Sequence, residues 1–337
     1  MNSFTDNLKA AARSRYHFSV CRGAFTLIEI MITIGLLSFI VLGLLAMFNQ
    51  TQKAFKAGMT QTDILESGRA TMDLLVREMQ EMKPSGYPLS RFNNTWVAAT
   101  NFFSELSPGF DNVGVANPPL LQELTDNYFP RTNLIQRFFF LRKVNQDWVG
   151  VGYQVIPDDP NGCVGTLYRF EGTNFSRQGP FTVSGDFIQA AAIAYQSNLN
   201  GRIITNLSRI ADGIVHLRVR AFATNGFMIV SGSTPGTNGF FEFDRTPAGL
   251  PIYTNVWDTS FYGSGYDNAQ SACYFMKEAV PAYVEVEMGI LEPQILRKYR
   301  SIPIAAAQRQ YLSNHVAEVH LFRQRIPVRN VDLTAYP

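Results

Sequence analysis

Cysteine and histidine are scarce in this 337-residue chain, which has three cysteines and four histidines. The cysteines lie far apart and form no C-x-x-C pair, which excludes zinc-ribbon and thioredoxin-like sites. The nearest approach to a metal-ligand cluster is His315, Glu318 and His320, but its order is not H-E-x-x-H and it supplies too few ligands for a closed site. We therefore expect no metal and no other cofactor.

Catalytic and nucleotide-binding fingerprints are also missing. The chain has no G-x-S-x-G, no P-loop and no G-x-G-x-x-G, so a hydrolase, an ATPase or a dinucleotide enzyme has no support. The run Asp158-Asp159-Pro160-Asn161-Gly162 offers oxygen ligands for calcium, but it lacks the spaced acids of an EF-hand and is typical of a turn. We predict that the protein is not an enzyme.

Charge is low and unevenly placed. Charged residues make up 17% of the chain, and the net charge is +2. The first 24 residues hold Lys9, Arg13, Arg15 and Arg22 against only Asp6, so their removal would change the net charge to −1. The basicity belongs to this segment, and it gives no ground for a nucleic-acid partner.

A long apolar run is what the chain does have. It extends from Phe25 to Phe48, and its only charged residue is Glu29. Such a run can cross a hydrocarbon core of about 30 Å, and the basic segment before it holds that side in the cytoplasm. A carboxylate inside a membrane segment is unfavourable, so Glu29 needs a partner.

An ordinary secretory signal has the opposite order of features. Its small-residue cleavage site follows a short apolar region, whereas Gly23 and Ala24 precede the run here. Cleavage at this point leaves the apolar helix on the mature protein. It also places a new α-amino group close to Glu29.

The stretch RGAFTLIE with its following apolar run resembles the class III signal of prepilins and pseudopilins. The resemblance implies that a prepilin peptidase removes the leader, that Phe25 becomes an N-methylated first residue, and that Glu29 becomes the fifth. Most members carry Gly directly before the cut, where this chain has Ala24. Cleavage after Ala24 keeps the spacing to Glu29, and cleavage after Gly23 would make Glu29 the sixth residue.

In that family the Glu pairs with the terminal amine of a neighbouring subunit as helices pack into a fibre. The implied partners are other pilins or pseudopilins, the peptidase and an inner-membrane assembly platform. The segments 68–79, 212–215, 281–286 and 329–330 are similar to W-type minor pilins and J-type minor pseudopilins. The implied function is a minor subunit that primes or builds a type IV pilus or type II secretion pseudopilus, with a single-pass inner-membrane anchor and a periplasmic head.

Hydrophobic periodicity predicts that the helix continues past the apolar run. An apolar stripe recurs at spacings of three, four and seven and should pack on a globular domain: Phe55, Met59, Leu65, Met72, Leu75, Met79 and Met82. Lys83-Pro84 then ends the helix. The expected organisation is a leader (1–24), a transmembrane half-helix (25–48), an amphipathic half-helix (49–83) and a head (84–337).

The sequence of the head predicts antiparallel β structure, so the expected fold class is α+β. Aromatic and β-branched runs at 137–144, 148–156 and 164–170 predict strands, and a last strand is expected within 319–330. In 214–222 and 283–291, alternation predicts one buried face and one wetter face that carries His216, Arg218, Glu285 and Glu287. A short helix is expected between 304 and 318.

Alternatives remain open at this point. Cys163 and Cys273 either form a disulfide in an oxidising compartment or are two separate buried thiols. A second function is a membrane-tethered surface binding protein or adhesin, in which the aromatic loop residues Trp257, Phe261, Tyr262 and Tyr266 stack on a ligand rather than on one another. A third is a membrane-tethered periplasmic enzyme, which would need a polar constellation that the sequence does not show.

Overall fold

The computed structural model describes the chain from Thr26 onward with gaps, and the following observations concern those residues alone. They are 26–85, 90–92, 95–97, 99–107, 121–123, 130–132, 134–158, 163–174, 180, 182–224, 226, 253–254, 273–276 and 279–331. The chain divides into two compact units, one ending at Ala57 and one beginning at Gly58. We call the second unit the head.

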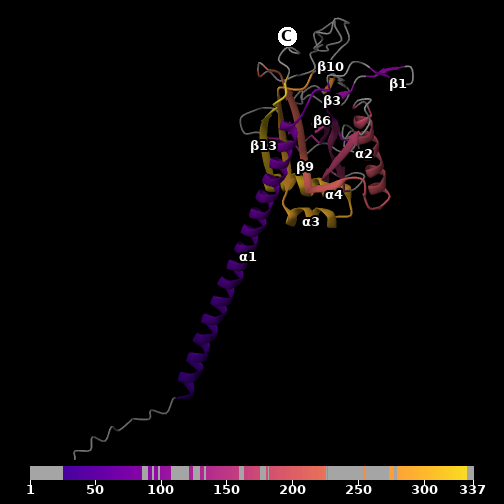
Figure 1. The fold of residues 1–337 in the computed structure, drawn as a ribbon. Coiled ribbons are helices and arrows are strands. Elements are labelled where there is room, and N and C mark those ends of the chain that lie inside the picture. Colours follow the sequence, from indigo (N-terminus) through magenta and orange to yellow (C-terminus); the bar gives the residue numbers. More distant parts are fainter. Residues whose placement is uncertain are drawn as a thin grey trace, which may run out of the picture. The chain divides into compact units, whose positions relative to one another are not determined.

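The described elements are predominantly strands that follow one long helix (Figure 1). The helices are α1 (Leu27–Gln80), α2 (Val183–Leu199), α3 (Pro293–Ser301), α4 (Ala305–Asn314) and the 3-10 turn η3 (Val316–Glu318). The strands are β1 (Ser90–Phe92), β2 (Thr95–Val97), β3 (Thr100–Leu106), β4 (Leu121–Glu123), β5 (Pro130–Thr132), β6 (Gln136–Val144), β7 (Asp147–Pro157), β8 (Gly165–Asn174), β9 (Ser208–Phe222), β10 (Tyr253–Thr254), β11 (Cys273–Met276), β12 (Tyr283–Leu291) and β13 (Val319–Pro327).

The α1 helix runs for 54 residues without interruption. It ends just before Lys83-Pro84, as the sequence predicts. The Lys83 amide then donates to Leu141 O at 2.9 Å, which joins the end of the helix to β6. The predicted long N-terminal helix is therefore confirmed.

A nine-stranded sheet organises the head, in the order β10-β11-β3-β6-β7-β8-β9-β12-β13 with antiparallel neighbours. The strands expected at 137–144, 148–156, 164–170 and within 319–330 are β6, β7, β8 and β13. An isolated parallel bridge joins Ile135, just before β6, to Leu217 of β9, and the Leu217 amide donates to Leu134 O at 2.7 Å. The observed fold class is α+β.

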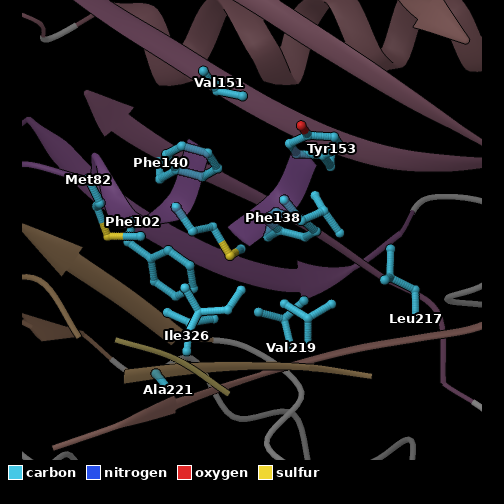
Figure 2. Packing of buried hydrophobic residues seen from close by; sticks show 14 of the residues in the cluster. Met82, Phe102, Phe138, Phe140, Val151, Tyr153, Leu217, Val219, Ala221 and Ile326 are labelled. Carbon is cyan, nitrogen blue, oxygen red and sulfur yellow. The ribbon is translucent and has the colours of Figure 1, made fainter. Parts of the chain in front are cut away.

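The main core lies between the last part of α1 and one face of the sheet. Helix α1 contributes Ile64, Met72, Leu75 and Met79, and Met82 follows just after its end. All five are buried, and Figure 2 shows Met82 among the core aromatic residues Phe102, Phe138 and Phe140. The predicted stripe is correct from residue 72 onward and wrong earlier. Met59 is 53% exposed and Phe55 is 68% exposed, Leu65 is half-buried, and Ile64 is the first fully buried apolar residue.

Gly68 explains how closely α1 approaches the sheet. A Cβ atom at this position would lie 2.2 Å from the ring of Phe322 on β13. Only glycine lets the Phe322 ring pack directly against the helix backbone. The other glycines of α1, Gly35, Gly43 and Gly58, have nothing within 4 Å of such an atom.

Helix α2 covers the opposite face of the sheet and was not predicted. Phe139 and Leu141 of β6 pack with Phe187 and Ala191 of α2, whereas Phe138 and Phe140 face α1. Two glycines of β7, Gly150 and Gly152, admit the side chains of Val183 and Phe187. The head is therefore a three-layer structure of α1, sheet and α2.

Helices α3 and α4 form a separate packing layer at one end of the sheet. Leu296 and Tyr299 of α3 and Leu312 of α4 pack on Val164 and Leu291. The helix expected between 304 and 318 is α4 followed by η3, and α3 was not predicted. This end also holds the beginning of β9 and the end of β12.

Candidate functional site

The N-terminal part of α1 is the sequence-predicted site, and its described residues are exposed all round. Every residue from Thr26 to Met59 is exposed, including the whole apolar run from Leu27 to Phe48. Among the described residues, α1 is the one helix long and apolar enough to cross a membrane, judged by length and composition. The processing residues Gly23, Ala24 and Phe25 lie outside the described residues.

Thr26 begins the helix and positions Glu29 in its first turn. The Glu29 amide donates to Thr26 O at 3.0 Å and lies 3.4 Å from Thr26 Oγ1. A carboxylate in the first turn of a helix interacts favourably with the helix dipole.

The hydroxyl groups of the apolar run are satisfied inside the helix, in contrast to Glu29. Thr33 Oγ1 donates to Ile30 O at 2.9 Å, and Ser38 Oγ donates to Ile34 O at 2.8 Å. Within the described residues, no hydrogen-bond donor or cation contacts the Glu29 carboxylate. In an apolar environment, a partner from another molecule would therefore stabilise the Glu29 side chain.

A buried ionic contact ties the other end of α1 to the sheet. The single Nε–H of Arg169 is shared between the two carboxylate oxygens of Glu78, each 3.1 Å from Nε, and Arg169 Nη2 donates to Glu78 Oε1 at 2.6 Å. Tyr153 Oη also donates to Glu78. Burial raises the pKa of Tyr153, and the neighbouring Glu78 charge raises it further, so the phenol remains a hydrogen-bond donor.

Two more polar contacts continue this attachment at the end of α1. Arg329 Nη2 donates to Gln80 Oε1 at 2.9 Å, and Asn330 Nδ2 donates to Met82 O at 2.9 Å. Arg329 and Asn330 make up segment 329–330 of the sequence analysis. This segment therefore joins the chain after β13 to the end of α1.

A second ionic cluster lies at the α3 end. Arg300 contacts Asp212 at 2.6 Å and Asp158 at 2.8 Å, and Asp212 also accepts from Thr166 Oγ1 at 2.8 Å. Burial alone would raise the pKa of Asp212, but the hydrogen bonds and charge of Arg300 outweigh it and lower the pKa. Asp158 is thus an ion-pair partner here, while Asp159 to Gly162 lie outside the described residues.

The face of β9 and β12 predicted to be wet is buried, which corrects the sequence interpretation. His216 and Glu287 are each 2% exposed, and Arg218 and Glu285 are also buried. Glu285 accepts from Arg220 at 3.0 Å and from Arg323 at 2.9 Å. Ion pairing across β9, β12 and β13 compensates the burial that the alternating pattern failed to predict.

The cysteines are separate thiols in the structure. Cys163 and Cys273 do not form a disulfide. Cys273 is buried with its Sγ 3.1 Å from Ser104 Oγ, and the Cys163 amide donates to Tyr299 Oη at 3.4 Å. Burial raises the pKa of the Cys273 thiol to about 11.

The remaining sequence candidates do not converge. His315 Nδ1 lies 2.7 Å from Tyr311 O, and His320 Nε2 lies 3.2 Å from Glu292 Oε1. In the part of the chain that the structure describes, no three His, Cys, Asp or Glu side chains are placed to hold a metal ion. Trp257, Phe261, Tyr262 and Tyr266 lie outside that part.

Described residues of the head line two open clefts. One is lined by Lys83, Pro84, Ser85, Lys143, Trp148, Asn330 and Val331. The other, at the α3 end, is lined by Ile156, Pro157, Asp158, Thr166, Tyr168, Asn198, Arg209, Arg300 and Gln308. Neither cleft juxtaposes a nucleophile with a general base.

Comparison with protein-family models, curated proteins and solved structures finds no match to this chain.

Proposed function

We propose that this protein is a membrane-anchored minor subunit of a type IV pilus or type II secretion pseudopilus. The N-terminal half of α1 holds the chain in the inner membrane, and after leader removal it packs with the helices of other pilins or pseudopilins. The observation that carries the proposal is an apolar helix exposed on all sides with one carboxylate, Glu29, in its first turn.

The exposed apolar surface supports an anchoring and assembly role. A helix that is apolar all round is stable only when lipid or other protein covers it. Residues such as Leu27 and Phe39 are 77% and 78% exposed. Lipid covers these side chains before assembly, and neighbouring subunit helices cover them afterwards.

Glu29 sets the register of this packing in the proposal. A carboxylate and an amine attract strongly in a medium of low dielectric, and an uncompensated charge there is costly. Pairing Glu29 with the terminal amine of a neighbouring subunit therefore selects one axial offset between helices. Other offsets leave both charges unpaired.

The second half of α1 supports the head. Its buried stripe and the Glu78–Arg169 contact fix the last part of α1 to the sheet, and α1 is one helix from Leu27 to Gln80. The basic leader places the head in the periplasm. Recruitment would involve an inner-membrane assembly platform, and the driving energy would come from a separate motor.

Intact mass and N-terminal peptide analysis test the processing step directly. The full chain is expressed with and without a prepilin peptidase and extracted from membranes. We expect a chain that begins with methylated Phe25 only when the peptidase is present. A start at Ala24 would shift the register of Glu29, and an unprocessed Met1 start in both samples would refute the pilin assignment.

Capture by partner subunits tests the role of Glu29. Glu29→Gln removes the charge with little change of shape, so membrane insertion should persist while capture of co-expressed minor pilins falls at least about tenfold. Glu66→Gln is the matched control, because Glu66 is an exposed acid of the same helix outside the apolar run. Equal capture by both variants would exclude Glu29 as the register device.

A further inference from the structure

We propose that one end of the head lies on the surface of an anionic lipid bilayer. This basic end is formed by α3, α4, the start of β9 and the loop after α2, and its defining side chains are Arg202, Ile203, Arg209, Arg297, Lys298, Arg300 and Ile304. The ligand is a layer of anionic headgroups. The proposal rests on the membrane anchoring included in the proposed function.

These side chains come from separate elements that meet at one place. Asn198 of α2, Arg209 of β9, Arg300 of α3 and Gln308 of α4 line a single cleft of about 470 Å³. The loop that follows α2 stays beside it, because the Arg202 amide donates to Ser197 O at 2.8 Å. Figure 1 shows α3 and α4 side by side at this end of the sheet.

Two apolar side chains project from the basic end. Ile203 is 86% exposed and Ile304 is 63% exposed, which makes them the most exposed large apolar side chains described from Gly58 onward. Each lies near basic residues in the chain. Ile203 directly follows Arg202, and Ile304 follows the basic helix α3, which carries Arg297, Lys298 and Arg300. Apolar side chains flanked by cations are typical of surfaces that rest in a membrane interface.

The charge of this end is positive after its ion pairs are considered. Both described carboxylates of the cluster, Asp158 and Asp212, are bound by Arg300. Arg202, Arg297 and Lys298 are exposed, and within the described part of the chain Arg297 Nε donates to the backbone of its own helix, at Pro293 O. Each cation close to an anionic surface strengthens binding by roughly fivefold at low salt.

The path of the chain brings the basic end within reach of the bilayer. Gln294, at the start of α3, donates to Thr60 Oγ1 of α1 at 3.2 Å. Residues 49–59 connect Thr60 to the apolar run, and even a fully extended chain of that length spans only about 40 Å. This limit comes from chain length alone, so any bilayer that holds residues 25–48 lies within that distance of α3.

A fluorescent label at position 304 measures the contact in the full chain. Ile304→Cys, in a Cys21→Ser, Cys163→Ser background that retains buried Cys273, is labelled with an environment-sensitive dye and reconstituted into vesicles with a lipid-borne quencher. Val144→Cys is the matched control, because Val144 is a 42% exposed apolar residue beside Lys143 at the end of β6. Vesicles of phosphatidylcholine alone are compared with vesicles that also contain phosphatidylglycerol.

We expect the label at 304 to be quenched at least about twofold more than the label at 144, only in vesicles containing phosphatidylglycerol, and this difference to disappear in 1 M salt. Replacing Arg297→Glu and Lys298→Glu should abolish it. Equal quenching at the two positions, or quenching independent of lipid charge, would overturn the proposal. Shielding of position 304 without vesicles would also overturn it, by identifying a second protein copy as the occupant.

Flotation of the same samples separates this inference from the proposed function. If the full chain floats with neutral vesicles while the label at 304 stays unquenched in anionic ones, the anchor stands and the basic end is not a lipid contact. If the chain fails to float with either vesicle, the membrane anchoring itself is wrong.

Discussion

Glu78 on α1 and Arg169 on β8 form a two-pronged ion pair, with Arg169 Nη2 2.6 Å from Glu78 Oε1 and Arg169 Nε 3.1 Å from both carboxylate oxygens. The side chain of Glu78 is 8% exposed and that of Arg169 is 15% exposed. The contact is thus a buried link between the long helix and the sheet. This geometry fixes the rotation of the last part of α1 about its own axis and its position along that axis relative to the sheet.

Glu78→Gln should destabilise the head by roughly 3 kcal/mol, because removal of one partner leaves a buried arginine with incomplete compensation. Urea unfolding of the detergent-solubilised full chain measures the loss. Glu81→Gln is the matched control, since Glu81 pairs with Arg142 at 3.2 Å but is 52% exposed. The control should change stability by no more than about 0.5 kcal/mol. Similar losses in both variants would show that burial of the Glu78 pair does not matter.

Gly68→Ala should destabilise the head by about 1–2 kcal/mol, because the new methyl group would overlap the Phe322 ring. Gly58→Ala has open space around the added methyl and should gain up to about 1 kcal/mol from helix propensity. Thermal melting compares the two. The Gly68 substitution should become harmless in a Phe322→Ala background, and a persistent loss there would point away from steric overlap.

Acid should weaken the α3 end through Asp212. Because the pKa of Asp212 is lowered in the folded protein, its contribution is complete above the ordinary value of 3.8 and is lost as the pH falls through the lowered pKa. Wild type should therefore melt higher than Asp212→Asn near neutral pH, and the difference should shrink below about pH 4. The Asp147→Asn variant, at an exposed site, should melt in parallel with wild type across this range. A pH-independent gap for Asp212→Asn would contradict the linkage.

Cys273 should resist alkylation in the native protein, since the thiol is buried and its pKa is raised to about 11. Maleimide treatment near pH 7.5 followed by peptide mass analysis should modify Cys163, which is half-buried, well before Cys273. Denaturation should make the two equally reactive. Rapid native modification of Cys273 would mean that the β11–β3 pair opens readily.

The long helix and the central strands are predictable because they depend on local patterns. Uninterrupted apolar periodicity predicts α1, and Lys83-Pro84 predicts its end. The aromatic runs of β6 to β8 are bounded by turn residues. In each case the sequence pattern that predicts the element lies within the element or directly beside it.

Other features depend on partners distant in the sequence. Helix α2 packs through Phe187, Ala191 and Ala194, while its exposed Ile188 and Ile193 obscure the apolar face in the sequence. The alternating charges of β9 and β12 predict a solvated face. In the structure they are buried, and Arg323 of β13 pairs with Glu285. Burial of Glu78 could have been predicted, because it follows the stripe residue Leu75 by three positions and so shares its face of the helix. Its partner Arg169 could not, because it is 91 residues away.

The closing contacts of the head also determine when it can finish folding. Asn330 is 248 residues from its partner Met82, and β13 supplies the last strand beside β12. Contacts across such separations form slowly, because a long loop must close before any free energy is gained. A chain emerging N-terminus first can therefore assemble the layers around β6 to β8 and pair Glu78 with Arg169, but the contacts of Arg329 and Asn330 with the end of α1 can form only after residue 330 has arrived. The fold of the head is thus complete only after residue 330 has been synthesised.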